Sequence, residues 1–207
     1  MAIAEREIAP RTLDAPTQKR LYTEDEYLAL EERAEEKSEY VHGEIRPMSG
    51  GTSYHGALAM NLGAALIAAL RGRGCLTMSS DVKVRAAGQM YYPDVSVTCG
   101  PQEYYGGNRT VITNPLLVAE VLSPSTEGKD RSEKFHHYLA VESLAVYLLV
   151  GQDEPRIEQF SRAEGGSWHY TRVSGLEDVL DIPALSISLR LADIYDQIDF
   201  SSRAEDE

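Results

Sequence analysis

The chain is poor in cysteine: Cys75 and Cys99 are its only two among 207 residues, and they do not form a CxxC pair. This count and spacing argue against a zinc site and against a secreted domain built on disulfides. The chain also lacks a basic N-terminal segment followed by an apolar one, so no secretory signal is indicated. These absences predict a cytoplasmic protein.

Long hydrophobic runs are also missing. The most apolar helix candidate, residues 56–70, contains Asn61 and two glycines and is too short to span a bilayer, so no membrane partner is expected. Hydrophobic residues still make up 43% of the chain, enough for one domain with a substantial core. We expect a flexible arm over residues 1–20, a single domain over 21–200 and a disordered tail over 201–207.

Basic residues are scarce, with 20 Lys and Arg against 33 Asp and Glu and a formal net charge of −13. Tight binding of bare duplex DNA is therefore not expected, because neutralising phosphates usually requires a basic face. The acidic residues crowd towards both ends of the chain. The middle holds basic residues that could form a local basic rim, namely Lys83, Arg85, Arg109, Lys129, Arg131 and Lys134.

Two predicted strands each carry one acidic residue in an apolar run. Residues 92–97 and 116–122 are rich in Val and Leu, which is typical of buried strands, and they contain Asp94 and Glu120. A lone ionised carboxylate on such a strand costs several kcal/mol. Two carboxylates on neighbouring strands can share a divalent cation, and their hard oxygens suit Mg²⁺ or Mn²⁺. Pairing with basic side chains, or strand ends in water, is the alternative.

A helix is predicted over residues 130–141, after the strand that carries Glu120. Asp130 and Glu133 fit an N-terminal capping box, and apolar residues follow at helical spacing. Lys134 then falls in the first turn, where its ammonium could orient water or neutralise charge on a phosphate. A solvated surface lysine is the alternative.

These residues, in this order, resemble the PD-(D/E)XK phosphodiesterase superfamily and, more narrowly, the Uma-type family of putative restriction endonucleases. The resemblance extends over roughly residues 22–194. The matching pieces are residues 40–45, 47–48, His55, 92–95, 118–126, Asp130, Lys134, Tyr138 and 147–150.

The resemblance implies a divalent-metal-dependent endonuclease that acts on nucleic acid, with DNA as the expected form. Asp94, Glu120 and the Val121 carbonyl would hold Mg²⁺ or Mn²⁺. The superfamily places its lysine two residues after the second acid, where this chain has Leu122, and in the Uma-type branch the helix lysine, here Lys134, is thought to replace it.

Two further residues are candidates for the site. Glu44 follows a turn glycine on an early strand, where the family often has an acid, and it could complete a metal shell or remain a solvated edge residue. His55 lies in the first turn of a long helix, whose N-terminus favours the neutral imidazole. A neutral His55 could accept a proton from water, and a capping or packing role is the alternative. The adjacent His136 and His137 are interpreted as structural.

Hydrophobic periodicity predicts an α/β fold with a restriction-endonuclease-like core: a mixed central sheet flanked by helices, with additional C-terminal β-strands. A first helix has Thr23 as N-cap with Glu26 at the capping-box position, and a strand pair over 40–48 turns at His42-Gly43. The other expected elements are a long helix from Thr52 or Ser53, strands at 76–85, 91–98, 115–122 and 145–150, a hairpin at 156–173, a short strand at 185–189 and a helix at 191–198.

Three function classes remain open at this point. The leading one is the metal-dependent nuclease. A non-catalytic nuclease-like module for partner binding or assembly is the alternative, favoured by the acidic composition and the displaced lysine, and a hydrolase of small phosphate-containing molecules is the third. A homodimer is expected, because the long helix rich in small residues and the C-terminal strands offer extra packing surface and two sites suit a duplex.

Overall fold

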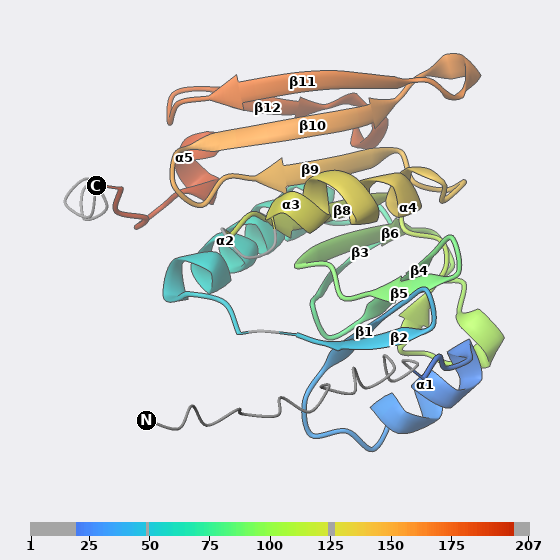
Figure 1. Cartoon of the computed structure of the whole chain (residues 1–207). Helices are drawn as coiled ribbons and strands as arrows, with labels where there is room; N and C mark the ends of the chain where they lie inside the picture. Colours follow the sequence, from blue (N-terminus) through green and yellow to red (C-terminus); the bar gives the residue numbers. More distant parts are fainter. Residues whose placement is uncertain (1–19, 49, 124–126, 201–207) are drawn as a thin grey trace, which may run out of the picture.

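A six-stranded mixed sheet forms the centre of the fold, in the strand order β11-β10-β9-β8-β6-β3. The computed structural model describes residues 20–48, 50–123 and 127–200 (Figure 1). The expected tail and all of the expected arm except Arg20 lie outside the described residues. The strands are β3 (Cys75–Ser79), β6 (Val95–Cys99), β8 (Leu117–Val121), β9 (Val146–Val150), β10 (Arg156–Arg162) and β11 (Trp168–Ser174).

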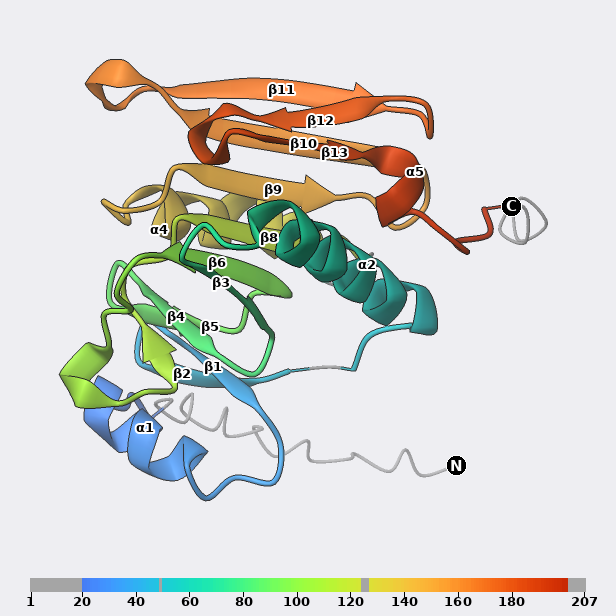
Figure 2. The ribbon, with the colours of Figure 1, turned by 180° about the vertical axis from the view of Figure 1, so that it is seen from behind.

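The two middle strands of this sheet, β8 and β9, are parallel, and every residue in both is buried. Helix α2 (Ser53–Leu70) covers one face of the sheet. A helical segment formed by α3 (Glu127–Lys129), the π-helical turn η2 (Asp130–Lys134) and α4 (Phe135–Leu139) covers the other (Figures 1 and 2). Because helices close both faces, the strand sequences are almost continuously apolar, as predicted.

A second sheet of five strands, in the order β2-β1-β5-β4-β7, lies beside the first and carries helix α1 (Glu24–Glu31). Its strands are β1 (Ser38–Val41), β2 (Glu44–Pro47), β4 (Lys83–Ala86), β5 (Gln89–Tyr91) and β7 (Val111–Ile112). A hairpin of β12 (Val179–Ile182) and β13 (Ile187–Arg190) packs with α5 (Leu191–Ile194) against α2. Short 3₁₀ turns are η1 (Tyr105–Gly107), η3 (Glu164–Gly166) and η4 (Pro183–Leu185).

Helix α2 is capped by Thr52, whose side chain accepts the His55 backbone N–H, as predicted. Its predicted leucine stripe is buried against the central sheet and consists of Leu58, Leu62, Leu66 and Leu70. The helix begins at Ser53, three residues before the predicted apolar run, and in the described part of the chain it is the one helix long and apolar enough to cross a membrane. The expectation that this helix is too short to span a bilayer was therefore wrong. Its leucine stripe is nevertheless buried in the core, as in a helix of a globular domain.

Several local predictions are confirmed, and two are wrong. Thr23 caps α1 in a full capping box with Glu26, and the β1–β2 hairpin turns at His42-Gly43. The predicted strand at 76–85 is instead split between β3 and β4, which belong to different sheets. The run at 91–98 is split in the same way between β5 and β6. In each case a turn or Pro93 interrupts the ladder and redirects the chain.

The two cysteines lie opposite each other across the antiparallel pair β3–β6 and form a disulfide. The sequence spacing did not predict this bond, because the cross-strand register that joins Cys75 to Cys99 depends on the fold. The fold does not depend on this link alone, since three apolar clusters fill its interior.

Leu62→Ala should lower the free energy of unfolding by about 2–5 kcal/mol, because Leu62 is fully buried between α2 and the sheet and its truncation leaves a cavity. Leu30→Ala is the matched control, since Leu30 is 50% exposed on α1 and should change stability by roughly 0.5 kcal/mol or less. Urea unfolding of both variants measures the difference. Equal effects would contradict the assignment of the leucine stripe to the core.

Candidate active site

A small cavity of about 70 Å³ at the end of β8 brings most of the predicted site residues together. It lies where the start of α2, the end of β8 and the turn η2 meet. Its lining consists of Met48, Gly50, Gly51, His55, Tyr92, Asp94, Glu120, Val121, Ser123, Asp130 and Lys134. The volume has room for a cation with a water or two, since one water occupies about 30 Å³ in the liquid. Asp94 and Glu120 thus line the same cavity, as predicted.

Lys134 is the centre of a buried charge cluster. Its Nζ lies 2.9 Å from Glu39 Oε1, 3.3 Å from Glu120 Oε1 and 3.4 Å from Asp130 Oδ1. The Tyr138 hydroxyl also donates to Glu120 Oε1, at 3.1 Å. Lys134 was predicted to lie near the Glu120 strand, and it does. The alternative of a solvated surface lysine is wrong, since its side chain is only 10% exposed.

The cluster holds more negative than positive charge. Burial raises the pKa of the Glu120 carboxyl well above its ordinary value, the neighbouring carboxylates raise it further, and Lys134 opposes them. Burial alone would lower the pKa of Lys134, but its three carboxylate partners outweigh that effect and raise it well above its ordinary value. The ammonium is therefore permanently charged, and Glu120 would be stabilised by a further cation.

Asp94 is fixed by the backbone of the neighbouring strand. Its Oδ2 accepts a hydrogen bond from the Val121 N–H at 2.7 Å, and the His55 Nε2 lies 3.3 Å from the same oxygen. The hydrogen bond from His55 to Asp94 raises the pKa of His55, and this effect outweighs burial. The expectation that the helix N-terminus lowers the pKa of His55 was wrong in direction, because the Asp94 carboxylate in front of the imidazole raises it.

Two carboxylates of the cluster had not been assigned to it from the sequence. Glu39, on β1, contacts Lys134, whereas the predicted Glu44 lies at the start of β2, pairs with Arg46 at 3.5 Å and does not line the cavity. Asp130 was predicted to cap a helix. The helical segment instead begins at Glu127, and Asp130 is buried in the π-helical turn four residues before Lys134. π-helical turns are frequent at functional sites and are not readable from hydrophobic periodicity.

Leu122 occupies the place where the superfamily has its lysine. It is 4% exposed and packs with Val118 and Tyr138 beneath the helical segment. Glu120 and Leu122 are two residues apart on the chain, so their side chains point to the same face of the sheet, the one covered by the helical segment that carries Lys134. A lysine at position 122 would be buried in an apolar cluster, and the helix supplies the ammonium to Glu120 instead.

The oxygen donors fit a hard divalent cation: the half-buried Asp94 and the buried Glu120 line one cavity, and the cluster carries excess negative charge. Within the described residues, no three His, Cys, Asp or Glu side chains form a ready metal cluster. Asp94 faces His55 and Glu120 faces Lys134, so a cation bound between the two carboxylates would compete with both of these contacts.

The expected basic rim is largely neutralised. Arg85 pairs with Glu24 at 2.6 Å, and Arg131 pairs with Glu158 at 2.6 Å. Lys83 is buried, donates to the Tyr92 hydroxyl at 2.8 Å, and burial lowers its pKa. The middle of the chain is therefore less attractive to phosphates than its sequence suggested.

Comparisons with known proteins agree with this fold. The model of the Uma2 family, described as "Putative restriction endonuclease", matches residues 24–192. Uncharacterized protein slr1290 of Synechocystis sp. is 36% identical over 173 residues, which cover 83% of this chain and 90% of that protein. Uncharacterized protein sll1609 of the same organism is 34% identical over 158 residues, 75% of this chain and 89% of that protein.

A solved structure is also similar: the crystal structure of a putative nuclease belonging to DUF820 from Anabaena variabilis. It gives a TM-score of 0.65 at 20% identity and covers 86% of this chain and 97% of that one. The chain therefore shares the mixed α/β fold of that structure. The chain belongs to the Uma2 family of putative restriction endonucleases.

The raised pKa of Glu120 predicts how stability depends on pH. Above the ordinary glutamate pKa of about 4.5, the folded protein retains a proton that the unfolded chain has released, so the free energy of unfolding should fall as pH rises towards the raised pKa. Glu120→Gln should flatten this fall, and Lys134 still has two carboxylate partners in the variant.

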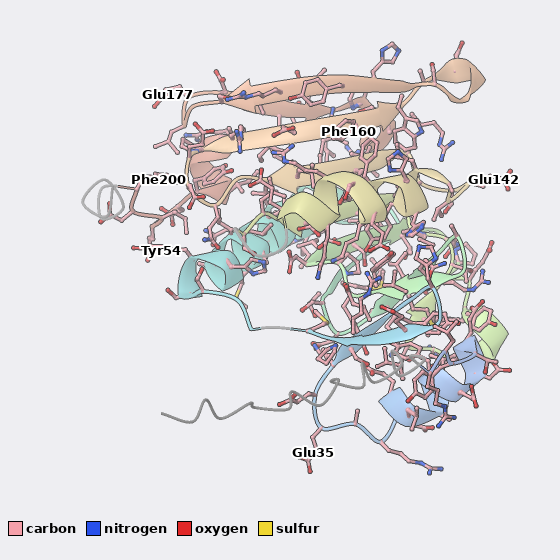
Figure 3. The ribbon with its side chains drawn as sticks, in the orientation of Figure 1. Glu35, Tyr54, Glu142, Phe160, Glu177 and Phe200 are labelled. Carbon is pink, nitrogen blue, oxygen red and sulfur yellow. A yellow bond between two sulfur atoms is a disulfide. The ribbon has the colours of Figure 1, made fainter. Side chains whose placement is uncertain are left out.

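Denaturant unfolding in EDTA over a pH series measures this dependence. Glu142→Gln is the matched control, because Glu142 is exposed on the loop before β9 and is labelled at the edge of the molecule in Figure 3. It should reproduce the wild-type curve. Parallel curves for the wild type and Glu120→Gln would contradict the prediction.

Proposed function

We propose that this protein is a divalent-metal-dependent endonuclease that hydrolyses phosphodiester bonds in nucleic acid, with DNA as the favoured substrate. The observation that carries the proposal is the convergence of Asp94, Glu120 and Lys134 on one small buried cavity. Membership of a family of putative restriction endonucleases supports it. Its expected location is the cytoplasm.

The proposal gives each residue a role. The Asp94 and Glu120 carboxylates and the Val121 carbonyl would hold Mg²⁺ or Mn²⁺, which when bound polarises a phosphate and lowers the pKa of a bound water. Lys134 is held in place by Glu39 and Asp130, and its ammonium would orient water or neutralise charge that develops on the phosphate. His55 keeps Asp94 oriented through their hydrogen bond.

The cavity is too small to enclose a nucleotide, so the phosphate would approach from its mouth. Arg85 and Arg131 of the expected rim are paired with carboxylates, and binding would therefore be weak and depend on the metal. This pairing of basic side chains with carboxylates also favours the second candidate function, a non-catalytic nuclease-like module for partner binding or assembly. In that case Lys134 would serve only to stabilise its three buried carboxylate partners.

The direct test is cleavage of single- and double-stranded DNA and of RNA with Mg²⁺ or Mn²⁺. Asp94→Ala should lower the cleavage rate by roughly 10²-fold or more, because a group that stabilises the transition state is lost. Glu44→Gln is the comparison variant, since Glu44 does not line the cavity, and its rate should stay close to that of the wild type. Equal rates for wild type and Asp94→Ala would assign any cleavage to a contaminant.

A thermal test separates metal binding from a structural role. Saturating Mg²⁺ or Mn²⁺ should stabilise the wild type by about 2–3 kcal/mol at one hundred times the Kd, which appears as a higher Tm. Asp94→Asn should abolish this shift without lowering the Tm of the metal-free protein, because an amide oxygen can still accept the Val121 N–H. If the Asp94→Asn variant has a lower Tm and the Tm of the wild type does not respond to metal, Asp94 has a structural role and does not bind a metal.

A further inference from the structure

Helix α2 presents an exposed face without charge. Its 18 residues include no Asp, Glu, Lys or Arg, although charged residues make up 26% of the chain. The face opposite the leucine stripe leaves Met60 76% exposed and Ile67 54% exposed. Figure 2 shows α2 on the near side of the molecule, where no element of the described chain lies in front of it.

This face forms one wall of a groove of about 760 Å³. The other wall is β3, which has a hydrogen-bonded neighbour on one side only. The helix residues along the groove include Gly56, Met60, Gly63 and Ile67. They recur every three or four residues and therefore share one face of the helix.

The two glycines are not needed for packing against any residue that the structure describes. A Cβ added at Gly56 or at Gly63 would meet no atom within 4 Å. Glycine is the poorest helix former after proline, so two of them on an exposed helix face need another reason. Their use is explained if a second backbone or a large side chain approaches this face closely.

The order of sizes along the face is small, large, small, large: Gly56, Met60, Gly63, Ile67. Read in the opposite direction, the order is large, small, large, small. Two copies of α2 packed antiparallel about a two-fold axis therefore place Met60 of each copy on Gly63 of the other, and Ile67 on Gly56. This self-complementarity is what an isologous two-fold interface requires.

Net charge also favours this face. Two copies, each with a formal charge of −13, repel one another across most of their surfaces. The exposed face of α2 carries no Asp, Glu, Lys or Arg, so a contact there brings no like-charged side chains of the two helices together.

We propose that a second copy of this chain docks on the exposed face of α2, through an antiparallel α2–α2 contact that seats Met60 against the partner copy's glycine. The groove is also lined by His55 and Asp94. The second copy therefore lies beside the candidate active site and forms part of the wall along which a substrate reaches Asp94.

The test measures the mass in solution by sedimentation and light scattering at micromolar concentration. The wild type should have about twice the single-chain mass of 22.9 kDa. Gly63→Met should weaken the dimer by roughly tenfold or more, because methionines then face each other at both contacts. Adding Met60→Ala to Gly63→Met should restore the dimer, since each new methionine then faces a small residue. Rising salt should strengthen the dimer by screening the repulsion between the two copies.

Circular dichroism and the Tm show that each variant is folded. Leu30→Glu is the matched control, because Leu30 is exposed on a different helix, and its mass should remain that of the wild type. A wild type that is monomeric at these concentrations would overturn the proposal. So would a Gly63→Met variant that remains fully dimeric, or binding of the wild type to neutral phosphatidylcholine vesicles that Met60→Glu abolishes.

Discussion

The buried contact between Lys134 and its three carboxylates joins three parts of the fold, which an apolar cluster also packs together. Glu39 comes from the five-stranded sheet, Glu120 from the central sheet, and Asp130 from the helical segment above both. Removing one partner from such a cluster leaves a buried charge uncompensated, which typically costs about 3–5 kcal/mol. The atoms that hold the candidate site together therefore also help to fix the packing of the two sheets.

The carboxylate excess at this point would favour the binding of a further cation. Burial raises the pKa of Glu120, the carboxylates of Asp130, Asp94 and Glu39 raise it further, and Lys134 offsets these effects only in part. Asp94 is oriented by the Val121 backbone and by His55, so the two acids are held in place before any ion arrives. Such preorganisation lowers the reorganisation required for binding and for chemistry.

The sequence predicted the elements whose signals are local. Asp94 and Glu120 stood out because each is an acid inside an apolar run, and Thr23 was recognisable as a cap because its partner Glu26 lies three residues away. Glu39 was missed because its contact with Lys134 depends on how one sheet packs against another, which periodicity does not encode. Asp130 was misassigned because a π-helical turn and a capping box can have the same spacing of acids.

The helical segment above β8 is also the connection that any parallel pair of strands needs. The crossover starts at the end of β8 and leads back to the start of β9. It therefore passes close to Glu120, which lies near the end of β8. A basic residue can therefore move from the strand to the crossover without altering the sheet. Position 122 can then be a leucine that packs in the apolar core, where a lysine would have to bury its charge.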